Sequence, residues 1–484
     1  MIEFRSFLRA AAAGLVLIAG PLRGDPAGAG WLEVDLAFDA TQFGGFPPDT
    51  MGAVGPDHVV TFLNGGVSVF RKSDGMLLSH RFLGAFWSDA GVGSTFDTYD
   101  PRVVYDPQSE RFFAVSLNDR LVSNQILVAV SSSADPSEPW TGFALDSDTT
   151  DATWADFPTL GFDADTVTIA ADMLAVGAEG LPIAVDVLSI PKADLLAAPP
   201  TIAGATLFER ANLAVTGFAP QPVTRLDGGG LPNWLFSSGL AFLGRLQSSR
   251  VAGSASAPTI AAGPHVMVDP MPTPPEALQP NATLLDTGDG HFASLVQVGA
   301  SIWGVHSATS DAGRAAIRWF EFDASDATVL QSGVIDHPDR DFLYPSIAAN
   351  PSGAVVIGFS ASGASLMPSA FAVLGETVAG VTTFGEPILV RAGSASFSGV
   401  PVSRFGDYSA TVLDASDDSR FWTFQEIGGP SNGGAVAVAS LRVVPEPDAP
   451  SAALIGVFAL RALAAVRARN CGGTHLRSRL GASA

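Results

Sequence analysis

The chain has 484 residues, of which 47% are hydrophobic and only 15% are charged, and it contains 51 glycines and 34 prolines. The large hydrophobic fraction excludes a disordered chain, while the abundant glycine and proline favour short strands and tight turns over long surface helices. The length is enough for one large β domain or two medium ones.

Charge is distributed unevenly along the chain. Eight of the 26 Lys and Arg residues, but only three of the 48 acidic residues, lie before residue 31 or after residue 447. The strongly acidic body between them repels phosphate backbones, which argues against nucleic acid as a partner. Divalent cations or neutral glycans suit such a surface, although acidity also serves simply to keep a secreted protein soluble. The one cysteine, Cys471, lies in the C-terminal tail, so the body has no disulfide and no thiolate metal site.

Residues 1–29 have the layout of a secretory signal peptide. Arg5 and Arg9 precede an apolar helical run at residues 10–19, and the small residues Ala27-Gly28-Ala29 follow it. A positive start, a short apolar run and an Ala-x-Ala site are typical of a cleaved export signal, and this run is too short to span a membrane. We therefore expect cleavage after Ala29 by signal peptidase; the alternative is an ordinary buried helix.

Residues 30–443 repeat a pattern of short strands with alternating side chains. The clearest unit follows Asp100 and has expected strands at residues 102–106, 111–116, 125–131 and 140–145, with a turn at residues 107–110. Four such strands with turn residues between them predict one antiparallel sheet. Strand pairs of the same kind are expected at residues 51–54 and 58–63, 159–163 and 166–171, 346–349 and 354–360, and 409–413 and 420–426.

Seven markers divide this body at intervals of 51 to 67 residues: Asp49, Asp100, Asp156, Pro222, Asp289, Tyr344 and Asp407. We therefore predict an all-β fold, a β-propeller of about seven four-stranded blades, because each sheet needs a neighbour on both faces and a closed ring leaves none exposed. Six or eight blades remain open. The alternative fold is a pair of β-sandwiches on either side of the proline-rich stretch at residues 264–280.

The blade pattern of residues 45–443 resembles that of sialidase-type, BNR-like secreted propellers, which implies the same fold. The resemblance does not extend to catalytic motifs. The sequence lacks the Ser-x-Asp-x-Gly-x-Thr-Trp box of sialidases, and Ser310-Asp311-Ala312-Gly313 matches only part of it.

Four of the units place an aspartate just before their first strand: Asp49, Asp100, Asp156 and Asp407. The first strand of a propeller blade lines the central channel, so these carboxylates are expected to converge at one mouth. Convergent oxygens predict a metal site for Ca²⁺ or Mg²⁺, with Ca²⁺ as the candidate cofactor. The same group would also serve as general acid and base, while the alternative is that each aspartate only caps its turn. Arg102, Arg404 and Tyr344 lie beside the markers, and we expect them to pair with the neighbouring aspartates.

The C-terminal residues have the layout of a membrane-targeting signal. Val444-Pro445-Glu446-Pro447 is followed by a nearly continuous apolar run at residues 451–466, by Arg467 and Arg469, and by a basic tail at residues 470–484. The prolines end the folded body, the apolar run predicts a transmembrane helix, and the arginines are expected to stay on the cytoplasmic side.

Residues 444–469 resemble the PEP-CTERM sorting signal of bacteria that make exopolysaccharide. The resemblance implies recognition by exosortase, transient anchoring in the inner membrane, and delivery of the body to the cell surface or the extracellular matrix. Arg461 interrupts the apolar run at a cost of about 3 kcal/mol if it lies centrally. The alternative is a plain C-terminal membrane anchor.

Two classes of function follow from these observations. The sorting tail, the acidic body and the lack of His-Glu-x-x-His, Gly-x-Ser-x-Gly or phosphate-cradling motifs favour a non-catalytic surface or matrix protein. Its expected partners are exopolysaccharide, another glycan or a surface protein. The alternative is a secreted glycoside hydrolase of propeller type, with carboxylates at the channel mouth as acid and base. No single residue is assigned as catalytic from the sequence.

Overall fold

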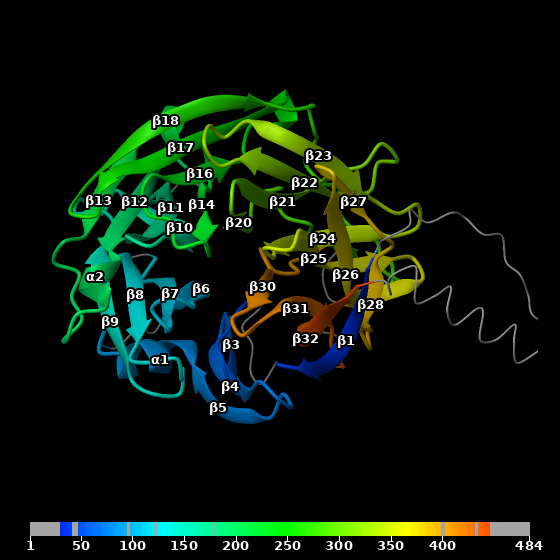
Figure 1. Ribbon diagram of the computed structural model, residues 1–484, viewed down its shortest axis with the longest axis horizontal. Coiled ribbons are helices and arrows are strands. Elements are labelled where there is room, and N and C mark those ends of the chain that lie inside the picture. The colour runs from blue at the N-terminus through cyan, green and yellow to red at the C-terminus, as the bar shows by residue number, and fades with distance from the viewer. Residues whose placement is uncertain are drawn as a thin grey trace, which may run out of the picture. The chain divides into compact units, whose positions relative to one another are not determined.

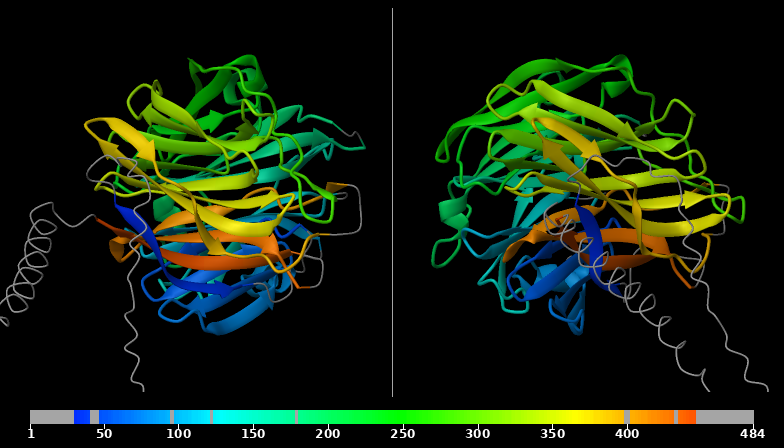
Figure 2. Two further views of the ribbon diagram at one scale, coloured as in Figure 1. Left: turned by 90° about the vertical axis from the view of Figure 1, so that its right-hand side faces the viewer. Right: turned by 45° about the vertical axis from the view of Figure 1, so that its right-hand side comes forward.

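The computed structural model describes residues 30–40, 47–93, 97–120, 123–177, 180–397, 402–430 and 434–445. Between Trp31 and Val444 the chain forms seven sheets of four or five strands set around a central axis (Figure 1). The views from the side in Figure 2 show the sheets stacked face to face around the ring. The predicted all-β propeller of seven blades is confirmed.

Blade 2 shows how the sequence forms one sheet. Its strands are β6 (Thr98–Asp106), β7 (Arg111–Asn118), β8 (Gln125–Ser131) and β9 (Trp140–Asp146), paired antiparallel in chain order. The turn between β6 and β7 is held by Asp106, whose carboxylate accepts from the Gln108 backbone N–H at 3.0 Å and from the Ser109 hydroxyl at 2.6 Å. Aspartate makes such turns because its short side chain reaches the backbone two residues on. The expected unit is confirmed, with β6 starting earlier than predicted.

The other blades follow the same order from the channel outward. Blade 1 has β2 (Met51–Val54), β3 (His58–Leu63), β4 (Gly66–Arg71) and β5 (Leu77–Phe82). Blade 3 has β10 (Thr153–Phe162), β11 (Thr166–Ala175), β12 (Ala184–Pro191) and β13 (Thr206–Ala211). Blade 4 has β14 (Gln221–Pro222), β16 (Asn233–Ser237), β17 (Arg245–Ser254) and β18 (Ala257–Met267).

Two later blades carry an extra strand. Blade 5 has β20 (Ser294–Val298), β21 (Ser301–Thr309), β22 (Ala315–Asp323) and β23 (Val329–Ile335), and β15 (Thr224–Arg225) pairs parallel with β20. Blade 6 has β24 (Asp341–Ala349), β25 (Ala354–Gly363), β26 (Leu366–Val378) and β27 (Val381–Phe384), and β28 (Ile388–Arg391) also pairs with β26.

Blade 7 joins the two ends of the body. It comprises β30 (Ala410–Asp414), β31 (Asp417–Gly428), β32 (Gly434–Val444) and, at its outer edge, β1 (Trp31–Asp39). β1 pairs antiparallel with β32 from Trp31 opposite Val444 to Asp39 opposite Ala437. This pairing closes the ring with backbone hydrogen bonds, so the outer edge of the last sheet is covered by the start of the body. Val444, predicted as the first residue of the sorting signal, is the last residue of β32.

The alternative of two β-sandwiches is wrong. Blade 4 ends with β18 inside the proline-rich stretch, and the connection from there to β20 carries β19 (Leu284–Leu285), which pairs parallel with β29 (Val402–Ser403). In addition, β15 lies before this stretch in the chain and joins the sheet that follows it. Strands from both sides of the stretch therefore belong to one ring.

The seams between blades are the hydrophobic core. Between blades 2 and 3, side chains from the facing sheets pack into one buried cluster that includes Phe113, Val115, Ile126, Leu160 and Ile169. Burying a large aliphatic or aromatic side chain contributes roughly 1.5–3 kcal/mol. Each sheet has such a seam on both faces. Its strands are therefore apolar at almost every position, whereas the strands of a half-exposed sheet alternate between apolar and polar residues.

Helices are short in the described residues. They are α1 (Leu83–Asp89), α2 (Lys192–Leu195), α3 (Leu213–Thr216) and the 3₁₀ turn η1 (Ala241–Leu243). Within the described part of the chain, none has the length and apolar character needed to cross a bilayer. The predicted signal peptide at residues 1–29, the transmembrane segment and the basic tail lie outside the described residues, as do Glu446, Pro447, Arg467 and Arg469.

Candidate functional site: the central channel

In each blade one strand lines the channel, and we call it the first strand; the seven are β2, β6, β10, β14, β20, β24 and β30. The seven first strands run in the same direction along the channel because each is followed outward by antiparallel strands in chain order. Their starts therefore gather at one end of the channel and their ends at the other. We call the end at the strand starts the acidic mouth, defined by Asp49, Asp100, Asp156, Asp407 and Glu426. We call the hollow lined by the later parts of the same strands the apolar cavity.

A left-handed residue precedes the channel-lining part of each first strand, either at a bulge inside the strand or two to four residues before the strand begins. The seven are Asp49, Asp100, Phe157, Ala219, Gly290, Tyr344 and Gly406, with φ between 40° and 100°. Five of them are not glycine, and for such residues a positive φ costs roughly 1–2 kcal/mol each. The kink interrupts strand pairing, as at the bulges between Tyr99 and Arg102 and between Leu343 and Ser346. Repeated strain of this kind at one end of the channel is typical of a position selected for function.

A chain of hydrogen bonds links the mouth residues of blades 1, 2 and 3. The Asn64 amide donates to Asp49 Oδ2 at 2.6 Å, and its oxygen accepts from the Asp100 backbone N–H at 2.9 Å. Asp100 Oδ2 in turn accepts from the backbone N–H of Phe157 at 3.1 Å. Asp100 therefore bonds to the next blade and does not cap its own turn.

Asp49 and Asp100 form a buried carboxyl pair. Asp49 is only 1% exposed, and no donor among the described residues reaches its Oδ1. Burial, followed by the charges of Asp407 and Asp100, raises the pKa of Asp49 well above its usual value, and burial also raises the pKa of Asp100. The interaction between the two side chains raises the pKa of Asp49 and lowers that of Asp100, so Asp49 is the one of the pair that keeps its proton more readily.

Asp156 and Asp407 are the more exposed carboxyl groups of the acidic mouth. Burial and the charges of Asp100 and Asp407 raise the pKa of Asp156 to about 8. Burial raises the pKa of Asp407 to about 6, against the opposing effect of Arg404, whose guanidinium lies 2.6 Å from both carboxylate oxygens. At neutral pH the first is therefore largely a neutral acid and the second largely a carboxylate.

Glu426 on β31 completes the acidic mouth. It is 4% exposed, and neither carboxyl oxygen has a hydrogen-bond partner among the described residues. Burial, then the charges of Asp49 and Asp407, raise its pKa well above the usual value. A Cβ on Gly434 would lie 2.3 Å from one Glu426 oxygen, and a Cβ on Gly406 would lie 3.0 Å from the other. The two glycines thus leave space for the Glu426 carboxyl group, whose two oxygens make no hydrogen bond to the described residues.

Arg102 separates the acidic mouth from the apolar cavity. Its guanidinium carbon lies 3.3 Å from the centre of the Tyr408 ring, and its Nε donates to the carbonyl of Pro158 at 2.8 Å. Its Nη1 contacts Met51 Sδ at 3.9 Å, and Met51 lines the cavity. Arg102 was expected to pair directly with an aspartate. Instead it stacks on an aromatic ring, and its charge acts on Asp100 and Asp49 without a direct ion pair among the described contacts.

The other two predicted neighbours differ in their contacts. Arg404 pairs with Asp407 as expected and also lies 3.7 Å from Asp286. The Tyr344 hydroxyl donates to the backbone carbonyl of Asp286 at 3.1 Å and not to an aspartate side chain. Asp286 was not singled out in the sequence, and nothing in its local pattern distinguishes it from other loop aspartates.

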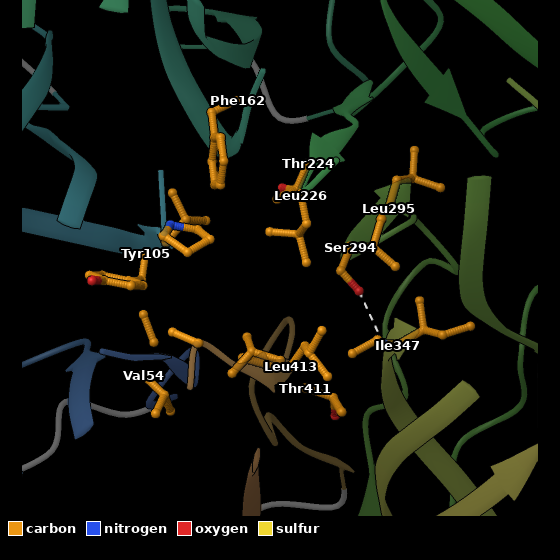
Figure 3. A pocket seen from close by; sticks show the side chains of 18 of the residues that line it. Val54, Tyr105, Phe162, Thr224, Leu226, Ser294, Leu295, Ile347, Thr411 and Leu413 are labelled. Carbon is orange, nitrogen blue, oxygen red and sulfur yellow. Dashed lines mark hydrogen bonds between the residues drawn. The ribbon is translucent and has the colours of Figure 1, made fainter. Parts of the chain in front are cut away.

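The apolar cavity occupies about 360 Å³ at the other end of the channel. Figure 3 shows Val54, Tyr105, Phe162, Leu295 and Leu413 arranged around it from different blades. Its polar lining is sparse, and the one hydrogen bond drawn joins the Ile347 backbone N–H to the Ser294 hydroxyl at 3.1 Å.

The structure brings the four predicted aspartates close enough to interact, since the charges of Asp100 and Asp407 raise the pKa values of both Asp49 and Asp156. In the part of the chain that the structure describes, however, no three Asp, Glu, His or Cys side chains are grouped so that they would hold a metal ion. The carboxyl groups instead bond to Asn64, Phe157 and Arg404. The Ca²⁺ site at Asp49, Asp100, Asp156 and Asp407 therefore stays a prediction.

Comparisons with known proteins add little beyond the fold. No family model matches the sequence, and no curated protein matches it significantly. Solved structures that align with it include extracellular domains 1–2 of Drosophila semaphorin 1a, with 9% identity over 84% of this chain and 88% of that one and a TM-score of 0.40. The exo-β-1,3-galactanase 1,3Gal43A from Clostridium thermocellum aligns with 10% identity over 85% and 99% of the two chains, with a TM-score of 0.34. A Trypanosoma rangeli sialidase mutant displaying trans-sialidase activity aligns with 10% identity over 77% and 56%, with a TM-score of 0.35. Likeness this distant assigns no activity to the chain.

Proposed function

We propose that the protein is an exported, non-catalytic β-propeller that binds neutral glycan at its acidic mouth. The proposal rests on one observation: carboxyl groups from blades 1, 2, 3 and 7 meet beside the strained backbone positions of the first strands, and burial raises their pKa values. A protonated carboxyl group both donates and accepts hydrogen bonds, as does a sugar hydroxyl. The partly exposed ring of Phe157 lies at the same place, where its backbone N–H donates to Asp100, and an aromatic ring packs against the apolar face of a sugar.

The acidic body supports a neutral ligand over an anionic one. Like charges would repel an acidic polysaccharide from the mouth, whereas hydroxyl groups have no charge to desolvate. The signal peptide and the sorting tail support delivery to the cell surface, where the producer's exopolysaccharide is the expected ligand.

Binding to a neutral exopolysaccharide fraction from the producing bacterium tests this function. We expect the full chain to bind, and the Asp156→Ala and Asp407→Ala variants to bind at least about tenfold more weakly, because each loses contacts worth about 1.4 kcal/mol. Arg391→Gln is the matched control, since Arg391 pairs with Asp39 on the outside of the ring. Wild-type affinity in both aspartate variants would contradict the proposal.

Export is tested separately by cell fractionation. We expect the body outside the cytoplasm, without residues 1–29 and without the segment that follows the Pro445-Glu446-Pro447 motif. Full-length product in the cytosol, with both termini intact, would contradict the address that the sequence predicts.

A second candidate function is glycoside hydrolysis. The specific observation that favours it is the separation of two pKa values, about 8 for Asp156 and about 6 for Asp407. A neutral acid beside an ionised carboxylate is the combination that general acid–base cleavage of a glycosidic bond requires. Release of reducing sugar from the same polysaccharide, abolished in both Asp156→Asn and Asp407→Asn, would establish it. Activity that survives both substitutions would exclude these residues.

A further inference from the structure

The apolar cavity lies outside the mouth and has no role in the function proposed above. Its walls are the later residues of the first strands, and the turns that follow those strands, at Pro107 and Pro351, line its rim. Protein interiors are packed closely and contain few voids larger than a water molecule. A hollow of about 360 Å³ falls within the roughly 300–1,000 Å³ range of small-molecule sites.

Two of the three carboxylates that line the cavity are paired with a cation. Asp414 is paired with Lys72 at 2.6 Å and accepts from the Trp422 indole N–H at 2.9 Å. Asp227 is paired with Arg225 at 3.2 Å. Asp418, the remaining carboxylate of the lining, is exposed at the rim. The interior therefore favours a neutral molecule, because a charged one would lose its hydration without gaining a partner.

One buried group in the lining lacks a partner. Gln221 is 3% exposed, and its Nε2 donates to the carbonyls of Leu160 and Pro222, both at 2.9 Å. These two bonds fix the amide, and its Oε1 has no donor among the described residues. A buried acceptor without a donor costs about 1–3 kcal/mol. A ligand that supplies one donor would remove this cost.

We propose that the apolar cavity is a second binding site, specific for a neutral apolar molecule that carries one hydrogen-bond donor, such as a long-chain alcohol or a phenol. The apolar body of the ligand packs among Val54, Phe162, Leu226 and Leu413, and its hydroxyl donates to Gln221 Oε1. Arg102 and Met51 close the cavity toward the acidic mouth, so the two sites bind independently.

Fluorescence of N-phenyl-1-naphthylamine, a neutral apolar dye with one N–H, tests the site in the full chain. We expect one saturable site per wild-type chain, and at least a tenfold loss of affinity in Leu226→Trp, whose larger ring fills the hollow. Leu330→Trp is the matched control, because Leu330 is 52% exposed on the outer strand β23. The apolar segment at residues 451–466 is present in all three proteins, so only the difference between them is interpreted. Equal binding by Leu226→Trp and Leu330→Trp, or no saturable binding by the wild type, would overturn the proposal.

Competition experiments test the single donor. We expect 1-octanol to displace the dye about fivefold better than 1-methoxyoctane, which has the same chain and oxygen but no donor. In Gln221→Met, which keeps the side-chain length and removes the amide, this difference should vanish while the dye still binds. An equal preference for 1-octanol in wild type and Gln221→Met would show that Gln221 does not accept a hydrogen bond from the hydroxyl. Thermal unfolding at wild-type temperature confirms that each variant is folded.

Discussion

The two ends of the channel are built from the same seven strands, yet one end collects carboxyl groups and the other collects apolar side chains. At the acidic mouth the backbone leaves the β conformation, with a positive φ at Asp49, Asp100 and Tyr344 among others. Along the apolar cavity the first strands pair without a register shift except between Leu413 and Asp414, and residues such as Leu160 and Phe162 face inward two apart. The kinks free the chain from strand pairing and so allow polar groups to reach the axis. Where pairing is regular, the sheet keeps its apolar interior.

Replacing the residue between the two ends should have the largest effect. Arg102 is 1% exposed, stacks on Tyr408 and donates to the Pro158 carbonyl. We expect Arg102→Met to lower the free energy of unfolding by about 3 kcal/mol, because it leaves buried carboxyl groups and a carbonyl without their cation. Urea denaturation measures the loss. Arg391→Met, which removes an exposed ion pair, should cost less than about 1 kcal/mol. Equal losses in the two variants would show that Arg102 contributes no more to stability than an exposed ion pair does.

A polar group placed at the apolar end should be the next most costly change. Leu413 is half-buried in the cavity wall, where the described structure offers few partners. We expect Leu413→Asn to lower the free energy of unfolding by about 2 kcal/mol, since its amide must be buried with unmet hydrogen bonds. Leu330→Asn on exposed β23 should change it by less than about 0.5 kcal/mol. If Leu413→Asn lowers the free energy of unfolding by as little as Leu330→Asn does, the cavity wall offers hydrogen-bond partners to the amide and is not apolar.

The acidic end should make stability depend on pH in a defined direction. Burial raises the folded-state pKa of Asp156 to about 8, well above its usual value of about 4. Its contribution to stability is therefore full below about pH 4 and is lost as the pH rises through about 8. We expect Asp156→Asn to flatten the fall in stability over this window by about 1 kcal/mol, after allowance for partial exposure. Unchanged pH dependence in the variant would contradict the raised pKa.

The ion pair at the rim of the mouth should have the smallest effect on stability. Arg404 is 52% exposed on its side chain and pairs with Asp407 at 2.6 Å. We expect Arg404→Gln to change the free energy of unfolding by less than about 0.5 kcal/mol. The same substitution should raise the pKa of Asp407 above about 6, because the cation that favours its ionised form is gone. An unchanged midpoint in the titration of Asp407 would contradict the pairing.

The arrangement of the blades could be predicted from the sequence because turn residues and alternating strands are local signals. The strands at residues 51–54, 58–63 and 125–131 match β2, β3 and β8 at both ends. The pairing of β1 with β32 could not be predicted, since it joins residues about 400 apart and has no local signature.

The candidate site could be predicted only in part. The aspartate markers lie at the kinks, and a residue followed by proline recurs there, at Asp100, Phe157, Ala219 and Tyr344. That repeat is a signal in the sequence that would also have pointed to Phe157. Glu426 could not be predicted as a site residue, because it stands in an ordinary strand, β31, and only the space left by Gly406 and Gly434 accommodates its carboxyl group at the mouth.

We infer that carboxyl groups from separate blades meet at one end of the channel and that some of them hold protons near neutral pH. Infrared absorption of protonated carboxyl groups, followed through a pH titration of the full chain, tests it most directly. We expect part of this absorption to persist above about pH 6 and to diminish in Asp156→Asn and in Asp49→Asn. Complete loss of the absorption by about pH 5 in the wild type, with no difference in either variant, would contradict it.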